Sequence, residues 1–266
     1  ELKARLRFRP EEENRLVIET AYTDLGQALG KAMKLIAAEK LGCDPQDITI
    51  VNSPDLAVQD TAASASLGTF YEAMEDFSRR LRRSLNIHIG NLVPHIGKRT
   101  FSYKSTPEPA KRLHWNRISY IAALIDMTVD QDTGSVQLHQ LRLFVDAGKI
   151  YDRVAAEAQI IGGAAHGIGD ALLLTPNNEA DYATQTRLYY QAIPKSTQIP
   201  PISVQFLNSE NLPFPIGVGE IGTMPIYQAI YDGLNTIVER TTGRPLPAHF
   251  SFPLTSEKVW RLLTRY

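Results

Sequence analysis

The sequence has 266 residues, 43% of them hydrophobic, which is long enough for a buried core without covalent cross-links. Its 28 basic and 29 acidic residues give a formal net charge of -1, which excludes a general field for nucleic acid or acidic membranes. The single cysteine, Cys43, excludes a disulfide framework or an iron–sulfur site built from this chain alone, and favours a reducing, cytoplasmic compartment. We expect a soluble chain, because no apolar run approaches the roughly 18 residues of a membrane span.

The first half begins with strand and helix patterns in turn. Residues 15–22 alternate with a period of two, which predicts a strand. Apolar residues then recur at helical spacing from 29 to 40, and Gly42 follows as a C-terminal stop. Residues 46–52 predict a second strand. The spacing of apolar residues over 67–85 predicts a long amphipathic helix.

The second half follows a loop-rich stretch, residues 86–117, that is interrupted by glycines and prolines. It combines a hairpin, a long helix, a further strand and a final helix, expected at 118–129 with 135–146, about 154–173, 202–207, and between a possible cap at Thr223 and Gly243. Strands and helices without regular alternation favour an α+β fold, with mixed sheets packed against long helices. We place the two subdomains at about 1–110 and 111–266.

Two loops in the first half lead directly into helices and contain small residues. Helix starts present free N–H groups and the positive end of the dipole, so they can hold phosphate or other anionic oxygen. The first loop is Asp24-Leu25-Gly26-Gln27, and an ordinary strand-to-helix turn is the alternative explanation. The second is Thr61-Ala62-Ala63-Ser64-Ala65-Ser66, which a hydroxyl-rich helix cap would explain equally well.

The helix that contains Gln159 is unusual because it also carries four glycines, each costing about 0.5–1 kcal/mol relative to alanine. Gln159, Gly163, His166 and Asp170 follow at intervals of four, three and four, which places a polar stripe on one helix face. A ligand that approaches this stripe would justify the glycines. Tight helix packing would justify them as well, and the sequence leaves both explanations open.

A third loop, residues 217–223, is rich in glycine and carries a single carboxylate, Glu220, just before a helix. A carboxylate in such a loop can accept a proton if its surroundings raise its pKa toward the working pH. Many acidic residues at helix starts instead favour only the helix dipole. The sequence of this loop alone does not separate the two roles.

In chain order, these motifs resemble the second, C-terminal molybdopterin-binding domain of the xanthine dehydrogenase and aldehyde oxidase family. Residues 24–27 are similar to the family's Glu-x-Gly-Gln loop, with aspartate in place of glutamate, and residues 61–66 match its Thr-Ala-Ala-Ser-x-Ser segment. Residues 158–163 are similar to its Gly-Gln-x-x-Gly helix, which follows a strand ending in Asp-x-Gly, here residues 146–148. Residues 217–220 match its Gly-x-Gly-Glu turn. The resemblance spans about residues 15–240.

The resemblance implies a molybdenum hydroxylase that acts on a purine-like heterocycle or an aldehyde, with Glu220 as catalytic base. It also implies a set of residues that contact the pterin, its phosphate or the surroundings of the molybdenum: Gly26, Gln27, Thr61, Ala62, Ala63, Ser64, Ser66 and Gln159. In this family the pterin dithiolene holds the molybdenum, so the resemblance implies no metal ligand from this chain. Ala62 and Ala63 would border the substrate pocket.

Further cofactors and partners are implied in the same way. The cofactor is molybdenum-molybdopterin, with the cytosine dinucleotide form an open alternative, and iron–sulfur clusters and FAD are expected on other domains or subunits. Partners would be the first molybdenum-binding half, the iron–sulfur and flavin portions, and further copies in an oligomer, with no nucleic acid or membrane. Because the chain starts at Glu1 and lacks these portions, we expect a fragment or one subunit.

Two other hypotheses remain beside the enzyme. The chain could be a carrier or insertion protein that holds molybdopterin without hydroxylase activity, in which case Glu220 would be dispensable. A purely structural relic is the third hypothesis, but it gives no reason for a carboxylate between glycines beside two anion-binding helix starts. The arginines at 79, 80, 82 and 83 lie on or beside a polar helix face and are interpreted as solvated.

Overall fold

The computed structural model shows a chain that divides into two compact units. Unit 1 comprises Glu1–Ser119, Ala147–Ala156 and Asn208–Val218, and unit 2 comprises Tyr120–Asp146, Glu157–Leu207 and Gly219–Tyr266. The structure describes residues 5–10, 15–24, 26–53, 56, 64, 66–96, 101–104, 118–173, 193–207, 212–247 and 251–264. Both units combine helices with a mixed sheet, so the α+β fold predicted from the sequence is confirmed.

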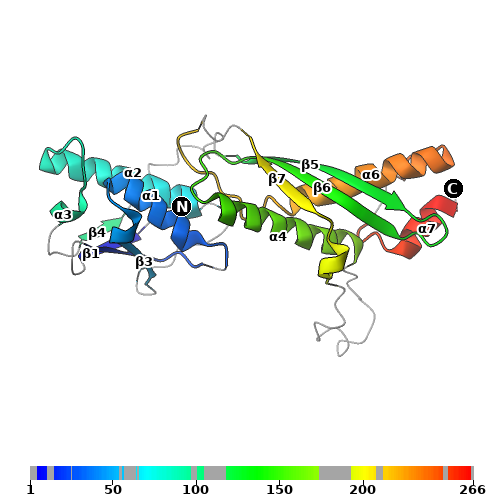
Figure 1. Ribbon diagram of the computed structural model, residues 1–266, viewed down its shortest axis with the longest axis horizontal. Coiled ribbons are helices and arrows are strands. Elements are labelled where there is room, and N and C mark those ends of the chain that lie inside the picture. The colour runs from blue at the N-terminus through cyan, green and yellow to red at the C-terminus, as the bar shows by residue number, and fades with distance from the viewer. Residues whose placement is uncertain are drawn as a thin grey trace, which may run out of the picture. The chain divides into compact units, whose positions relative to one another are not determined.

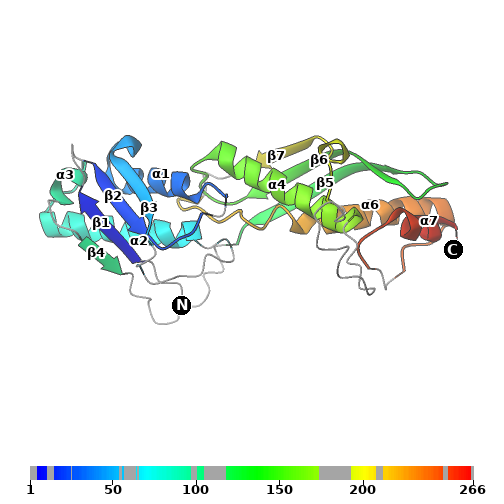
Figure 2. The ribbon, with the colours of Figure 1, turned by 90° about the horizontal axis from the view of Figure 1, so that it is seen from below.

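Unit 1 is built on a four-stranded sheet with the order β3-β2-β1-β4 (Figure 2). The central pair is antiparallel, and β2 and β3 are parallel. All five residues of β2 are buried, so the alternation that predicted this strand does not correspond to one exposed and one buried face. The bounds of the strands are β1 (Arg5–Pro10), β2 (Leu16–Thr20), β3 (Ile48–Asn52) and β4 (Phe101–Lys104).

Two long helices of unit 1 lie side by side, as Figures 1 and 2 show. Helix α1 (Leu29–Leu41) follows β2 and ends at Gly42, whose φ of 71° supplies the left-handed stop that the sequence predicted. Helix α2 (Ser66–Leu85) follows β3. Because β2 and β3 are parallel, both helices start from the same edge of the sheet, where the carboxyl ends of these strands lie.

The core of unit 1 is contributed by the sheet and both helices. Phe8 of β1 stacks on Phe77 of α2 with ring centroids 4.0 Å apart, and Met33 and Ile36 of α1 are 1% and 0% exposed. Two short elements flank this core, the 3-10 helix η2 (Pro45–Asp47) and the helix α3 (Val93–Ile96). The helical character of 45–47 and 93–96 differs from the strand and the loop that the sequence predicted there.

Unit 2 contains a three-stranded sheet with the order β5-β6-β7. The predicted hairpin is present as β5 (Tyr120–Val129) and β6 (Val136–Asp146), with a register shift between Asp126 and Met127. β7 (Ile202–Phe206) pairs parallel to β6. A 3-10 helix, η4 (Ser196–Gln198), precedes β7.

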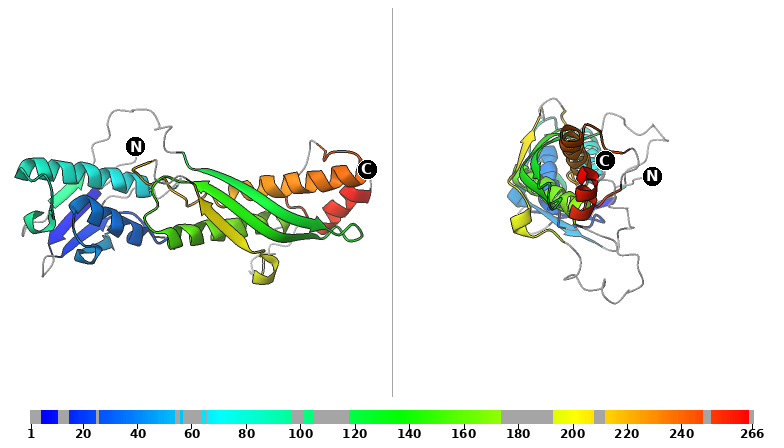
Figure 3. Two further views of the ribbon diagram at one scale, coloured as in Figure 1. Left: turned by 45° about the horizontal axis from the view of Figure 1, so that its top comes forward. Right: turned by 90° about the vertical axis from the view of Figure 1, so that its right-hand side faces the viewer.

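Three of the helices that the structure describes lie wholly or mostly in unit 2. They are α4 (Arg153–Leu172), whose first turn belongs to unit 1, α6 (Met224–Thr242) and α7 (Ser256–Thr264). Figure 3 shows the green helix α4 and the orange helix α6 beside this sheet. Helix α6 packs along β5, and the Met127 side chain fits against Gly233, where an added Cβ would lie 2.5 Å from its sulfur. None of the helices that the structure describes has the length and apolar character that crossing a membrane requires.

Candidate functional site

The loop before α1 is closed by its own side chains. The Asp24 carboxylate accepts hydrogen bonds from the backbone N–H groups of Gly26 at 2.9 Å and Gly30 at 3.4 Å. The Gln27 amide donates to the Thr23 carbonyl at 3.2 Å. Gly26 has a φ of 108°, which favours glycine, and an added Cβ would meet nothing within 4 Å. Asp24 therefore acts as a cap of this turn, and open space remains beside Gly26.

Ser64 lies ahead of α2 in the left-handed region, with a φ of 54°. The backbone of Gly217 approaches it so closely that a Cβ on residue 217 would lie 1.8 Å from the Ser64 carbonyl oxygen. This contact explains the glycine at 217, because any side chain there would displace Ser64. Ser66 is 7% exposed in the first turn of α2. The predicted site residues Thr61, Ala62 and Ala63 lie outside the described residues.

In unit 2, the turn that carries Glu220 is tied to α4. The Gln159 side chain donates from Nε2 to the Gly219 carbonyl oxygen at 2.8 Å. Glu220 itself is exposed. Gln159 makes no hydrogen bond through its own carbonyl oxygen to the residues that the structure describes, so this acceptor can serve a ligand. The two residues that the sequence singled out on separate elements are thus adjacent in unit 2.

The glycines of α4 mostly have a packing explanation. An added Cβ would lie 3.1 Å from the Gly222 Cα at Gly163, 2.8 Å from the Thr223 carbonyl oxygen at Gly167, and 2.7 Å from the Pro194 ring at Gly169. Only at Gly162, among these four glycines, is there nothing within 4 Å. The alternative of tight packing therefore accounts for three of the four glycines, because the turn before α6, the start of α6 and Pro194 approach the helix there.

The polar residues of the α4 stripe also have local partners. Asp170 accepts a hydrogen bond from the Tyr227 hydroxyl at 2.9 Å, and His166 Nε2 lies 3.9 Å from the other carboxylate oxygen. The His166 side chain is 73% exposed. Thr223 is the N-cap residue of α6 by position, but its hydroxyl donates to the Gly163 carbonyl at 3.1 Å, so its side chain does not cap the helix.

Each unit therefore brings together its own group of candidate site residues. Unit 1 brings the loop at 26–27 and the segment at 64–66 to one edge of its sheet, and unit 2 brings Gln159 to the turn of Glu220. Sequence reasoning missed the contact between Gly217 and Ser64, since residues so far apart in the chain give no local signal. It also missed the hydrogen bond that the Tyr71 hydroxyl donates to the Pro213 carbonyl oxygen, at the start of the segment that leads to Gly217.

Features within each unit suit the groups that a pterin and a phosphate present. Ser64 and Ser66 lie at the start of a 20-residue helix, whose positive dipole end favours anionic oxygen. Among the described residues, nothing lies within 4 Å of a Cβ added at Gly26 or Gly162, and none donates to the Gln159 carbonyl oxygen. Within the described ranges, no three His, Cys, Asp or Glu side chains gather as a metal site.

Comparison with known proteins gives a consistent result. The family model of a molybdopterin cofactor-binding domain matches residues 3–93 and 93–200. One subunit of a probable xanthine dehydrogenase from Bacillus subtilis (strain 168) is 26% identical, over 85% of this chain and 35% of its own length. The gamma subunit of the 6-hydroxypseudooxynicotine dehydrogenase complex from Paenarthrobacter nicotinovorans is 24% identical, over 84% and 34%.

A solved structure shares the fold over nearly the whole chain. The aldehyde oxidoreductase from Desulfovibrio gigas superimposes with a TM-score of 0.78 at 21% identity, covering 98% of this chain and 30% of that protein. The chain thus spans about a third of the length of the relatives that it matches.

Proposed function

Because this chain belongs to the molybdopterin cofactor-binding domain family, as in xanthine dehydrogenases and aldehyde oxidoreductases, we propose that it forms one part of a molybdenum hydroxylase and that Glu220 is its catalytic base. The observation that carries the proposal is the hydrogen bond from Gln159 to the Gly219 carbonyl. It joins the two motifs that the sequence connects with cofactor binding and with proton transfer.

The residues proposed to hold the cofactor are those that the resemblance to the family implies, of which 61–63 lie outside the described residues: Gly26, Gln27, Thr61, Ala62, Ala63, Ser64, Ser66 and Gln159. The bound cofactor would supply the two-electron redox chemistry. Gln159 would keep one side of its amide on Gly219 and turn the other, its carbonyl oxygen, toward a donor of the cofactor. The form of the pterin, with or without a cytosine dinucleotide, is left open in this proposal.

Glu220 is suited to proton transfer because its carboxylate is exposed at a turn whose backbone is fixed on both sides. The Gly219 carbonyl is bound by Gln159, and Gly222 lies against α4, where a Cβ would be 2.5 Å from the Ile160 carbonyl oxygen. A general base needs such a fixed position within hydrogen-bond reach of the proton that it accepts. In the proposed reaction, a Glu220 carboxylate oxygen would accept the proton of the attacking hydroxyl as the C–H bond of the substrate carbon is replaced by a C–O bond, and the two electrons of the C–H bond would pass to the bound cofactor.

The substrate classes proposed are purine-like heterocycles and aldehydes, which follow the names of the xanthine dehydrogenase and aldehyde oxidoreductase relatives. Because the chain covers about a third of these proteins, we propose that the first molybdenum-binding half and the iron–sulfur and flavin portions lie elsewhere in the same protein or on partner subunits. An oligomeric assembly and a cytoplasmic location are part of the same proposal, the latter because of the single cysteine.

The test is the Glu220→Gln variant of the assembled enzyme, which keeps the size and hydrogen-bonding capacity of the side chain but removes the base. We expect kcat to fall by about 100-fold or more, as for removal of a general base, while molybdenum and pterin contents match those of the wild type. Asp232→Asn serves as a control for the loss of one negative charge, since Asp232 lies on α6 and bonds Gln228 of the same helix.

The carrier hypothesis makes the opposite forecast for this variant. A protein that only holds or inserts molybdopterin would keep its cofactor and its transfer to an acceptor enzyme when Glu220 is replaced. Equal turnover of the wild type and Glu220→Gln enzymes would therefore remove the catalytic role from this residue. Loss of bound cofactor together with activity would instead make Glu220 a binding residue.

A further inference from the structure

The Tyr71 side chain connects α2 to the segment that leads toward Glu220. Tyr71 is 9% exposed, and its hydroxyl donates a hydrogen bond to the Pro213 carbonyl oxygen at 3.0 Å. The same hydroxyl accepts a hydrogen bond from Lys40 Nζ at 2.8 Å. One proton and one lone pair of this hydroxyl are thus in use, and the direction of the hydrogen bond to Pro213 is fixed by the lysine.

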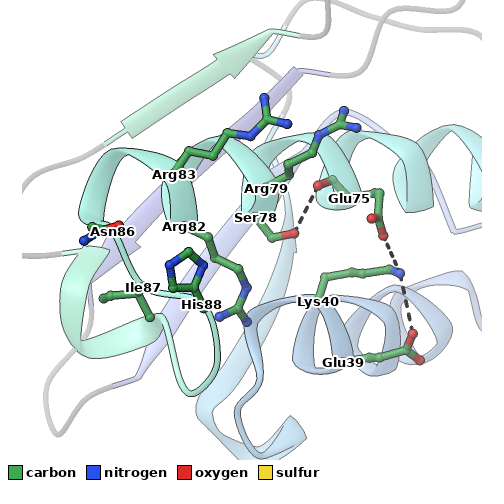
Figure 4. A pocket seen from close by; sticks show the side chains of 10 residues that line it. All are labelled: Glu39, Lys40, Glu75, Ser78, Arg79, Arg82, Arg83, Asn86, Ile87 and His88. Carbon is green, nitrogen blue, oxygen red and sulfur yellow. Dashed lines mark hydrogen bonds and ion pairs between the residues drawn. The ribbon is translucent and has the colours of Figure 1, made fainter.

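The Lys40 ammonium group is held beside the Tyr71 hydroxyl by several contacts. Its side chain is 13% exposed, and Nζ lies 2.5 Å from Glu75, 3.6 Å from Glu39 and 4.2 Å from the centre of the Tyr71 ring. Burial favours the neutral amine, but the hydrogen bonds to Glu75 and Tyr71 outweigh it and raise the pKa of Lys40. Figure 4 shows the row of Glu75, Lys40 and Glu39 beside a cavity of about 580 Å³.

The segment from Pro213 to Gly217 is fixed on unit 1 by backbone contacts as well. The Phe214 carbonyl accepts from the Lys149 N–H at 3.0 Å, and the Ile216 N–H donates to the Ala147 carbonyl at 2.9 Å. The Phe214 ring packs against the unit 1 core. Tyr71 adds a side-chain hydrogen bond at the start of this segment, four residues before Gly217.

Ser64 depends on this segment. A left-handed serine is uncommon and is kept only where its surroundings determine it. The backbone of Gly217 lies directly against Ser64, as the 1.8 Å separation for an added Cβ shows. Movement of the 213–217 segment away from α2 would therefore remove one of the contacts that hold Ser64 ahead of the helix.

We propose that Tyr71, oriented by Lys40, is a positioning residue for Ser64: it holds the Pro213 carbonyl and so keeps Gly217 against the serine. The inference rests on the proposed function, in which Ser64 contacts the molybdenum cofactor. Tyr71 itself does not touch the cofactor in this proposal. Its effect passes through the backbone from 213 to 217.

The first experiment compares hydrogen exchange in the full chain for the wild type, Tyr71→Phe and Tyr227→Phe. The control loses a hydroxyl hydrogen bond of similar length, to Asp170 in unit 2. We expect Tyr71→Phe to speed exchange about five- to tenfold in peptides that cover 61–66 and 213–217, the effect of losing about one hydrogen bond. Lys40→Met should give a change in the same peptides, because it leaves the Tyr71 hydroxyl without its donor. Unchanged exchange there in both variants would overturn the proposal.

The second experiment measures molybdenum and pterin contents of the assembled enzyme carrying the same substitutions. At equal global stability, we expect the molybdenum and pterin contents of the Tyr71→Phe enzyme to be about one third of those of the Tyr227→Phe enzyme or lower. Faster exchange with unaltered cofactor content would limit Tyr71 to a structural role and overturn its assignment to the cofactor site. If the wild-type enzyme itself holds no cofactor, the proposed function fails, and that result is distinct from the response to Tyr71→Phe.

Discussion

At the scale of the residue, Asp24 shows how a family position can acquire a local role. Its two carboxylate oxygens accept from Gly26 and Gly30, which makes it the cap of the turn before α1. The chain has an aspartate where the family that it resembles has a glutamate. The shorter side chain accepts hydrogen bonds from backbone N–H groups a few residues further along the chain. Capping therefore competes with any direct role of Asp24 in binding.

This capping can be tested by stability measurements on the full chain. Asp24→Ala should lower the free energy of unfolding by about 1 kcal/mol, because it leaves two N–H groups at the helix start without a side-chain acceptor. Asp24→Asn should lie within about 0.5 kcal/mol of the wild type, since its amide oxygen can still accept. Urea titration at neutral pH distinguishes the two variants, and equal losses in both would contradict a capping role.

At the scale of the element, α4 provides a matched pair of glycines. Gly167→Ala would bring a Cβ within 2.8 Å of the Thr223 carbonyl oxygen and 3.0 Å of the Ile226 Cβ, so α6 and its leading turn would have to move. We expect a loss of about 1–3 kcal/mol. Gly162→Ala meets nothing within 4 Å and should stabilise the same helix by about 0.5–1 kcal/mol.

The measurement is again unfolding of the full chain, with both variants compared in the same titration. The sign of the difference is the decisive quantity, because both substitutions add one methyl group to one helix. A stabilising Gly167→Ala would mean that α4 does not pack on the turn as the structure shows. A destabilising Gly162→Ala would mean that something covers the open position.

Much of the element pattern could be predicted from local sequence. Gly42 and Gly243 both adopt left-handed C-caps, at the helix ends that the sequence indicated. The long helix after residue 66 and the hairpin of β5 and β6 were predicted from periodicity, which depends on near neighbours alone. The strand β1 and the helix α7 were not predicted, although β1 is no shorter than the predicted strands β2 and β7.

The site was predictable where its residues belong to one motif and not where distant segments meet. Glu220 and Gln159 were singled out separately, but nothing in either motif indicates that the Gln159 amide binds Gly219. Gly148 is another case: its φ of 63° and the 2.5 Å between an added Cβ and the Phe214 carbonyl oxygen become visible only when residues 147–149 pair with 214–216. Such pairings are set by the tertiary fold and leave no local period.

At the scale of the whole molecule, the chain enters unit 1 three times. Residues 147–156 and 208–218, which we expected in the second subdomain, belong with the first 119 residues. Their contacts with α1 and α2 include the ion pair of Lys149 with Glu39 at 2.5 Å and that of Lys31 with Asp152 at 2.6 Å. The return at 208–218 places Gly217 against Ser64, and the return at 147–156 pairs with 214–216, so the surroundings of Ser64 depend on residues far apart in sequence.

The pair of Glu39 and Lys149 makes this dependence sensitive to pH. Burial alone would raise the pKa of Glu39, but the hydrogen bond and the positive charge of Lys149 oppose it, and the pKa of Glu39 lies below its ordinary value. A carboxyl whose pKa is lower in the folded state stabilises the fold above its unfolded pKa and loses this contribution as pH falls through the folded value. We therefore expect Glu39→Gln to cost about 1 kcal/mol or less near neutral pH, since the pair is partly exposed.

The cost should shrink toward zero as the pH falls from the ordinary pKa of a glutamate through the lower folded-state pKa of Glu39, where the wild-type carboxyl also becomes neutral. Urea unfolding of both proteins across this range measures the gap between them. Lys149→Met is the matched partner variant, and its cost should shrink over the same range because the attraction that it removes requires ionised Glu39. A gap that stays constant with pH would show that packing of the side chains, rather than their charges, holds residues 147–152 on α1.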